Sequence, residues 1–520
     1  MDRSRALQLQ RPGEAGRLRP GRTIGVIDVG SNTARFVAFE ASASGSVRAF
    51  FETKESPRLG LGTGPDGRLS DEAIERGILA VDRFAIAIRA LDLSRTIAVA
   101  TSAVRDAPNG ADFVRRVERE TGVSLRIISG AEEARYGYLG VAGAWELDND
   151  LVCDLGGGSM QLAEVRSGKL RNSVSVPLGV LRMTQRFLDH DPPKRREVDE
   201  LREHIRETLN SVLEAFGGRR YRVYGVGGTL RSLARAAIEF RDYPIERVHG
   251  YPLWDHDLEA LGELLGEMSA PKRRAIPGIG TDRADVVMAG IVVLGELIRS
   301  TGAGRIVVAG TGIREGLALD AIGAKLPASA EELAERSVEA ASESFAFRLD
   351  HGREVADTAL GLFEVLASQF EWGRSEGLAL RVAAWMHDSG ASIDLWRHAH
   401  HSAYLIQNYP IWGLDQREVL LAAMAARMHE GEGLPGDWKK AFLPIIRGAD
   451  FETARRLGAV LEIAELTSGA RPRFSLGGGG KALSVAFSAP TATTLPAHWE
   501  ERVRRTMERG IEREVRFRDA

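Results

Sequence analysis

The chain has 520 residues, of which 44% are hydrophobic and 27% charged, and its formal net charge is −3. This length predicts three or four domains of an ordinary globular protein. The negative balance argues against bulk attraction to polyanions, so we expect no specific nucleic-acid partner, and any anion site must be built locally. No apolar stretch reaches membrane-spanning length. The single cysteine, Cys153, fits a reducing cytoplasm.

The N-terminal segment, residues 1–22, is rich in Arg, Gly and Pro and lacks an apolar core. This composition predicts a disordered tail and is unlike a secretory signal. From residue 23 an apolar run leads to Asp28, a turn containing Gly30, Ser31 and Asn32 follows, and a second apolar run begins at Ala34. Glycine lets backbone N–H groups approach an anion without an obstructing Cβ. We therefore predict a β-hairpin whose turn binds phosphate.

Strand and helix patterns alternate through residues 45–128, which indicates α/β layers. Ser129 and Glu132 then match a capping box, so Glu132 has a structural role available. Glu133 has no such role. A second carboxylate in this first helical turn is a candidate general base.

The segment 151–165 repeats the pattern of the first hairpin, with Asp154 at the end of a strand and a Gly-Gly-Gly-Ser turn after it. A carboxylate beside such a turn cannot hold phosphate itself, and we expect it to hold Mg²⁺ or a water on that metal. Two further glycine turns follow strand-like runs, at 224–229 and 308–316. Four glycine turns of this kind predict two related lobes that face each other across a phosphate.

The pattern changes near Gly323, beyond which long amphipathic helices dominate to about residue 476. Within residues 477–520 we expect a strand at 482–487 and a charged helix at 498–518. We divide the chain into a tail (1–22), two lobes (23–145 and 146–322), an all-α domain (323–476) and a C-terminal segment (477–520).

These motifs together resemble the exopolyphosphatase and guanosine pentaphosphate phosphatase (Ppx/GppA) family. The resemblance rests on the Asp28 and Asp154 loops, on residues 129–134 between them, and on the segments 101–105, 177–179, 225–229 and 312–316. It implies two actin-like (ASKHA, ribonuclease H-like) lobes, a homodimer, and Mg²⁺- or Mn²⁺-dependent removal of terminal phosphate from inorganic polyphosphate or guanosine pentaphosphate.

The resemblance also implies residue roles. Glu133 falls on the catalytic glutamate, and Asp154, with Asp28, on the metal site. The phosphate-binding positions are Asp28, Gly30, Ser31, Asn32, Arg105, Gly156, Gly157, Gly158, Ser159, Gly227, Gly228 and Thr229. Four basic clusters, Lys194–Arg196, Arg219–Arg220, Lys272–Arg274 and Lys439–Lys440, are candidates for a polyphosphate path.

Two alternatives share the expected fold. An ATP-dependent kinase would need a phosphoacceptor pocket, which the sequence does not indicate, and the Glu133 motif argues against it. A chaperone-like ATPase would continue into a β-rich peptide-binding domain, whereas this chain continues into helices.

The helical domain also resembles the HD superfamily of metal phosphohydrolases. The candidate metal ligands are His351, His387, Asp388, His401 and His429. Glu465 stands where a final aspartate would be usual, and for that reason the sequence favours a metal-free scaffold.

Overall fold

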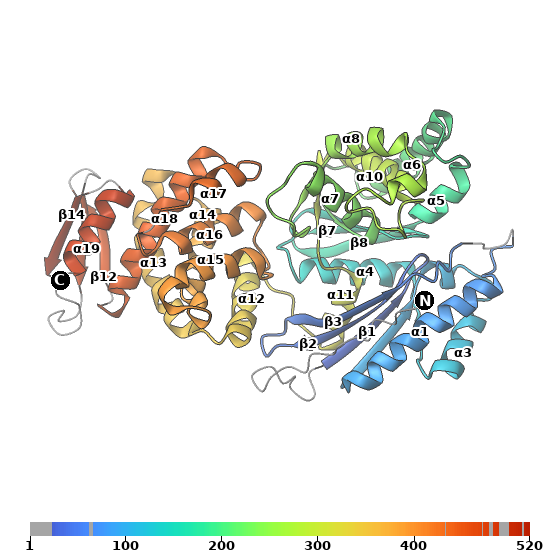
Figure 1. The fold of residues 1–520 in the computed structure, drawn as a ribbon, viewed down its shortest axis with the longest axis horizontal. Helices are drawn as coiled ribbons and strands as arrows, with labels where there is room; N and C mark the ends of the chain where they lie inside the picture. Colours follow the sequence, from blue (N-terminus) through green and yellow to red (C-terminus); the bar gives the residue numbers. More distant parts are fainter. Residues whose placement is uncertain are drawn as a thin grey trace.

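The structure is a computed structural model that describes residues 23–61, 66–431, 433–470, 472–477, 482–487, 499–511 and 514–519. The tail expected at 1–22 lies outside the described residues. Figure 1 shows the two lobes side by side, with the helical domain and the C-terminal strands extending from one end. The prediction of two α/β lobes followed by an all-α domain is confirmed.

The first lobe is built on a five-stranded sheet in the order β3-β2-β1-β4-β5. Its strands are β1 (Thr23–Val29), β2 (Ala34–Ala41), β3 (Val47–Glu55), β4 (Arg95–Ala100) and β5 (Arg126–Ile127). Helices α1 (Asp71–Leu91), α2 (Ser102–Arg105) and α3 (Gly110–Thr121) belong to this lobe. Apolar side chains of α1 and α3, Phe84 and Phe113 among them, form one core with Phe36 of β2.

The second lobe has a six-stranded sheet in the order β10-β11-β9-β6-β7-β8. Its strands are β6 (Asp150–Leu155), β7 (Met160–Arg166), β8 (Lys169–Val176), β9 (Arg222–Val226), β10 (Pro252–Trp254) and β11 (Arg305–Val308). Its helices are α5 (Val180–Phe187), α6 (Arg195–Ala215), α7 (Gly228–Phe240), α8 (Asp255–Gly266), α9 (Ala270–Arg273) and α10 (Val287–Thr301). In both lobes the first strand of an antiparallel hairpin also pairs in parallel with the fourth strand of its lobe, β1 with β4 and β6 with β9.

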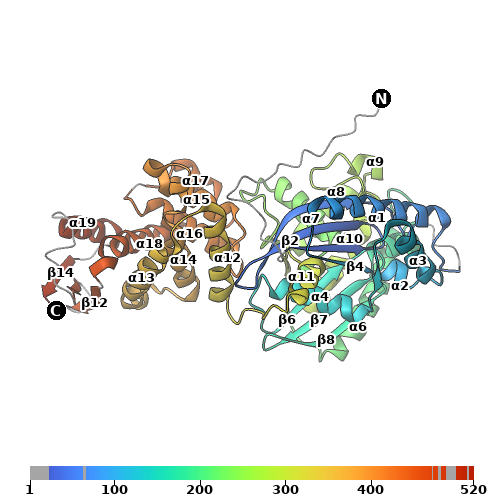
Figure 2. The same ribbon diagram turned by 90° about the horizontal axis from the view of Figure 1, so that it is seen from below.

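Two helices lie between the sheets, α4 (Gly130–Ala142) and α11 (Ile313–Ala321) (Figures 1 and 2). They cross at glycines: a Cβ on Gly140 would lie 1.9 Å from the Gly312 carbonyl oxygen, and one on Gly316 would lie 1.9 Å from that of Tyr136. Helix α4 packs on β6, β7 and β8, whereas α11 packs on β1. By sequence position α4 falls in the first lobe and α11 in the second, yet each helix packs on the sheet of the other lobe.

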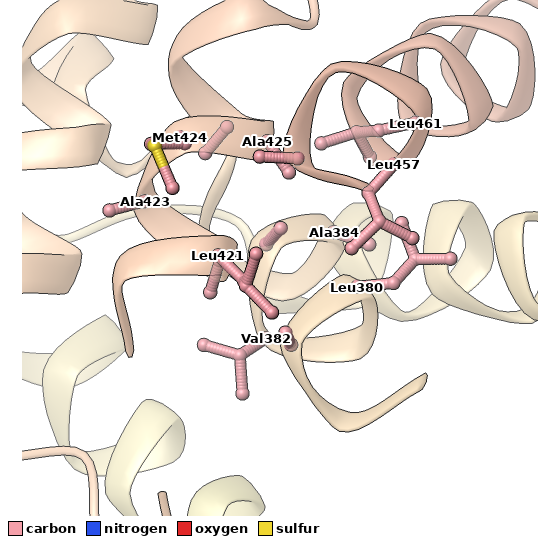
Figure 3. Packing of buried hydrophobic residues seen from close by; sticks show 14 of the residues in the cluster. Leu380, Val382, Ala384, Leu421, Ala423, Met424, Ala425, Leu457 and Leu461 are labelled. Atoms are coloured by element: carbon pink, nitrogen blue, oxygen red, sulfur yellow. The ribbon is translucent and has the colours of Figure 1, made fainter. Parts of the chain in front are cut away.

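The helical domain has one apolar core (Figure 3). It comprises α12 (Ala330–Phe345), α13 (Leu349–Phe370), α14 (Arg374–Met386), α15 (His398–Asn408), α16 (Gln416–Met428), α17 (Gly436–Ala441), α18 (Gly448–Thr467) and the 3₁₀ turns Ser389–Ser392, Leu395–Arg397 and Ser468–Ala470. Leu380 of α14, Leu421 of α16 and Leu457 of α18 belong to this core. Burying such leucines stabilises the domain by about 2 kcal/mol each, and fixes the ends of these helices relative to one another.

The C-terminal segment differs from the expected strand and helix. Strands β12 (Pro472–Gly477), β13 (Ala482–Phe487) and β14 (Glu514–Asp519) form a sheet, with β13 parallel to β14. The terminal helix is only α19 (Trp499–Thr506), continued by a π-turn at Met507–Ile511. The helical prediction for 514–518 was wrong because pairing with β13 outweighs local helix propensity there. Within the described residues, no helix combines the length and apolarity needed to cross a membrane.

Candidate functional site

The two hairpin turns have matching geometry. In the first turn the Gly30 N–H donates to the Thr33 carbonyl oxygen at 3.0 Å, and in the second the Gly156 N–H donates to that of Ser159 at 3.0 Å. A buried hydroxyl contact, Ser31 Oγ to Ser102 Oγ at 2.8 Å, fixes the first turn.

The two turns meet face to face across the lobes. A Cβ on Gly158 would lie 2.6 Å from both the Ser31 and the Ser102 hydroxyl oxygens. A side chain at this position would therefore separate the loops, which explains the run of glycines.

The third and fourth glycine turns open helices. Gly227 precedes α7 with φ +117°, and a Cβ there would lie 2.4 Å from the Leu155 carbonyl oxygen. Gly312 precedes α11, the helix that carries Arg314 in its first turn. The exposed N–H groups of such helix starts favour negative charge.

All four turns line one cavity of about 90 Å³. Of the predicted site residues, those lining it are Asp28, Gly30, Ser31, Asn32, Glu133, Asp154, Gly156, Gly157, Ser159, Gly227 and Gly228. Three others sit behind this lining: Gly158 at the loop contact, Thr229 under the third turn, and Arg105 against Glu133.

Four arginines of the cavity were missed by sequence reasoning: Arg35, Arg231, Arg283 and Arg314. Arg231 Nη1 donates to the Gly310 carbonyl oxygen at 3.2 Å, and Arg283 Nη1 to the Thr229 hydroxyl at 3.2 Å. Arg314 Nη1 lies 3.7 Å from Asp28 Oδ2. Arg231 and Arg314 each follow a glycine turn within the first helical turn, a signal that could have been used. Arg283 comes from the loop before α10 and has no such signal.

Glu133 is the acidic side chain of α4 that reaches the cavity. Its side chain is buried, and Arg105 Nη1 donates to its Oε2 at 2.7 Å. Burial raises the pKa of Glu133 to about 7, with Arg105 opposing and Asp154 and Asp28 adding to the rise.

Glu132 faces away and caps the helix. Its carboxylate accepts from the Ser129 N–H and from the Ser129 hydroxyl, each at 2.9 Å, and these bonds together with Arg126 lower its pKa to about 2. The Glu132 N–H in turn donates to the Ser129 hydroxyl, which completes the cap. The structure thus separates the two glutamates as the capping-box argument predicted.

Two aspartates bring negative charge to the same cavity. Burial, followed by the charge of Asp28, raises the pKa of Asp154 to about 6, and burial also raises the pKa of Asp28. Burial lowers the pKa of Arg231 to about 10. Two half-buried carboxylates that repel each other form a donor set suited to a divalent cation, for which carboxylate oxygens are the preferred ligands.

The basic clusters expected along a polyphosphate path do not all face solvent. Arg273 is buried and donates to the carbonyl oxygens of Leu265 and Ala284, so it supports the fold of the second lobe. A second cavity of about 240 Å³ instead shares Arg35, Arg231, Arg283 and Arg314 with the first.

In the helical domain the ligand atoms of His351, His387, Asp388 and His429 gather near one another as predicted, but the groups also contain His398. His401 belongs to neither group among the described residues. His398 and His401 lie one turn apart on α15, and sequence spacing alone does not show which of them joins the group of ligand atoms.

Comparison with known proteins places this geometry in a family. Sequence models described as the Ppx/GppA phosphatase family and as domain III of that phosphatase match residues 39–324 and 333–472. Exopolyphosphatase 1 of Mycobacterium tuberculosis is 32% identical over 305 residues, covering 57% of this chain and 87% of the relative. A guanosine-5'-triphosphate,3'-diphosphate pyrophosphatase of Aeromonas hydrophila is 28% identical over 489 residues, covering 91% and 92%.

Solved structures give the same result for the two lobes. The crystal structure of an exopolyphosphatase from Cytophaga hutchinsonii is 25% identical with a TM-score of 0.54, covering 59% of this chain and 99% of that one. With its lobes and its helical domain each matched in this way, the chain belongs to the Ppx/GppA phosphatase family.

Proposed function

We propose that this protein is an exopolyphosphatase, which releases the terminal phosphate of inorganic polyphosphate by attack of water. The observation that carries the proposal is a buried glutamate, Glu133, in the one cavity that gathers the four glycine turns. Phosphoryl transfer to water requires held phosphate, neutralised charge and an oriented nucleophile. The family membership supports a phosphatase over the kinase and chaperone alternatives.

Glu133 is the proposed general base. With a pKa of about 7 it is partly ionised at neutral pH, where a base is most effective. It would take a proton from water as the water oxygen attacks the terminal phosphorus. The bond to the bridging oxygen breaks, and the shortened chain departs with that oxygen. Arg105 acts as a positioning residue, because its Nη1 holds one carboxylate oxygen and leaves the other available.

Asp28 and Asp154 are the proposed holders of a divalent cation, with Mg²⁺ the expected ion and Mn²⁺ the alternative. Their fit rests on their shared place in the lining of the cavity and on their mutual repulsion, which a bound cation would relieve. When bound, the ion would neutralise phosphate charge during the displacement. The turn N–H groups and the arginines missed by sequence reasoning would hold the phosphate oxygens.

The adjoining cavity favours polyphosphate as the substrate. Its basic lining residues are Arg35, Lys54, Arg231, Arg235, Arg283 and Arg314, against the acidic Glu52, Asp282 and Glu315. The residues described as lining it include no aromatic side chain on which a guanine base could stack. A chain of phosphates leaving the active site along this surface would meet a cationic wall at each step.

Guanosine pentaphosphate is the second candidate substrate. It is favoured by the Aeromonas relative, a guanosine-5'-triphosphate,3'-diphosphate pyrophosphatase whose match spans nearly the whole of both chains. The homodimer implied by the resemblance and the cytoplasmic location indicated by the single cysteine stay predictions.

Phosphate release from both substrates, with and without Mg²⁺, tests the proposal. We expect polyphosphate to be hydrolysed with the higher kcat/KM and only when the cation is present. A higher kcat/KM for guanosine pentaphosphate would transfer the assignment to the second candidate. Release from neither substrate would refute both.

A further inference from the structure

A buried histidine connects the helical domain with the fourth glycine turn. His249 lies in the loop between α7 and β10, and the residue is only 3% exposed. Its Nδ1 accepts a hydrogen bond from the Gly310 N–H at 3.0 Å. Because an N–H can only donate, Nδ1 carries no proton, and the neutral ring has its proton on Nε2. His249 is therefore a fixed acceptor beside the first glycine of the fourth turn.

Two tryptophans from different parts of the chain enclose the imidazole. Trp145, in the loop between α4 and β6, stacks on it with ring centroids 4.8 Å apart and an interplanar angle of 22°. Trp412 of the helical domain meets it at 4.8 Å and 71°. Burial in this enclosure, followed by the charge of Arg247, lowers the pKa of His249 to about 3. The imidazole therefore stays neutral at physiological pH, and its Nδ1 stays available as an acceptor.

The helical domain also holds the backbone of the loop that carries His249. Gln416, the first residue of α16, donates from its Nε2 to the carbonyl oxygens of Arg247 and His249, each at 3.3 Å. Its Oε1 accepts from the Tyr243 hydroxyl at 2.5 Å. Gln416 is buried, and both ends of its amide have partners, as buried amides generally do. The position of His249 is therefore set jointly by the second lobe and the helical domain.

Gly310 connects His249 with the cavity between the lobes. While its N–H donates to His249, its carbonyl oxygen accepts from Arg231 Nη1 at 3.2 Å. Arg231 lines the cavity in the first turn of α7. A Cβ on Gly310 would lie 3.2 Å from the His249 Cβ, which is closer than an ordinary contact. A shift of the imidazole would therefore turn the peptide groups of Gly310 and move the arginine.

We propose that His249 is a positioning residue of the phosphohydrolase reaction, which holds Arg231 in place through Gly310 and makes its position depend on the helical domain. The proposal rests on the function proposed above, in which Arg231 binds phosphate oxygens. A guanidinium strengthens binding and turnover only where its N–H groups meet those oxygens, so a displaced Arg231 weakens both. His249 itself is not among the described residues that line the cavity.

The competing explanation is that His249 only fills space in the core. Two substitutions separate the explanations. Asparagine carries its Oδ1 on Cγ, the atom that carries Nδ1 in histidine, so His249→Asn keeps an acceptor but loses the stacked ring. His249→Phe keeps a ring between the tryptophans and has no acceptor. His256→Phe is the matched control, because His256 is exposed and stacks on Trp254 in the same lobe.

We expect His249→Phe to lower kcat/KM for polyphosphate at least about tenfold, the scale on which misplaced groups reduce catalysis. His249→Asn should lose less activity than His249→Phe although it melts at a lower temperature, and His256→Phe should match the wild-type protein. A residue that only fills the core gives the reverse order, with activity following the melting temperature. Activities of the two His249 variants in the order of their melting temperatures would overturn the proposal.

Pyrophosphate binding, measured by calorimetry with Mg²⁺ present, gives a readout that does not require turnover. His249→Phe should weaken this binding in the wild-type background and have no further effect in the Arg231→Gln background, because the two residues act through one path. Additive effects of the two substitutions would overturn the proposal. Wild-type protein that binds pyrophosphate but hydrolyses neither polyphosphate nor guanosine pentaphosphate would refute the proposed function alone, whereas absence of binding would refute both.

Trp412→Ala tests the share of the helical domain, since it removes that domain's side of the enclosure around the imidazole. We expect it to weaken pyrophosphate binding in the same direction as His249→Phe and by a smaller factor, because the acceptor on His249 remains. Unchanged binding in Trp412→Ala would overturn the dependence on the helical domain.

Discussion

Replacing Glu133 by glutamine removes the proposed base while retaining the shape of the side chain. Loss of a general base usually costs at least about a hundredfold in turnover, which corresponds to roughly 2.7 kcal/mol of transition-state stabilisation. The wild-type protein should also show a pH dependence that the variant lacks. With a pKa of about 7, Glu133 is about one-tenth ionised at pH 6 and nine-tenths at pH 8, so activity should rise roughly tenfold between them.

Glu133→Gln should lower turnover but increase the free energy of unfolding at alkaline pH. The folded-state pKa of Glu133 is raised from 4.5 to about 7, so its contribution to stability is full below pH 4.5 and is lost as pH rises through 7. The difference corresponds to roughly 3 kcal/mol of unfolding free energy. In the absence of metal, Glu133→Gln should therefore be more stable than the wild-type protein at pH 8, by at most that amount, and should show no such gain at pH 4.5.

Phosphate release and chemical denaturation, each measured at several pH values, test both expectations. Glu132→Gln is the matched control, because a glutamine still caps the helix and the side chain faces away from the cavity. Near-normal turnover in Glu133→Gln would remove this residue from the mechanism. Constant wild-type activity between pH 6 and 8 would contradict the proposal that burial raises the pKa of the catalytic base, Glu133, to about 7.

Three further outcomes follow from the same geometry. Arg105→Gln removes a contact that lowers the pKa of Glu133, so the midpoint of the pH–activity profile should move above 7; an unmoved midpoint would exclude Arg105 as a positioning residue. Asp154→Asn should raise the Mg²⁺ concentration needed for half-maximal activity and lower turnover, and an unchanged Mg²⁺ titration would contradict the metal assignment. A fragment ending near Gly323 should still hydrolyse short polyphosphate, because the phosphate loops and Glu133 precede it, and gel analysis should show that it releases intermediates of long chains that the full chain degrades to completion. Equal processivity of the fragment and the full chain would assign the helical domain another purpose.

The elements of the site that were predicted from sequence are those whose chemistry is local. A glycine turn beside an aspartate, or a serine three residues before a glutamate, is specified within a few residues, and the structure has both patterns where expected. The identity of Glu133 as the buried glutamate followed from the capping role of its neighbour. Such patterns depend on backbone geometry that nearby residues determine.

The parts that sequence reasoning missed depend on contacts between distant segments. Arg283 reaches the cavity from a loop 54 positions away from its partner Thr229. His398 rather than His401 belongs to the group of ligand atoms in the helical domain, because His398 Nε2 lies 3.4 Å from Asp388 Oδ1 and 3.3 Å from His429 Nε2. The strand at 514–519 exists through its pairing with β13. Periodicity within one segment carries no information about such partners.

The crossing of α4 and α11 connects the chemistry of the two lobes. Helix α4 carries Glu133 and packs on the second sheet, whereas α11 carries Arg314 and packs on the first. At the crossing, Gly140 and Gly316 leave no space for a Cβ against the backbone of the other helix. A change in the angle between the lobes would therefore move the proposed base and an arginine of the cavity together rather than separately. The glycines of the crossing thus act on catalysis through position. Although neither residue lines the cavity, an alanine at either should lower turnover by displacing Glu133 and the fourth glycine turn.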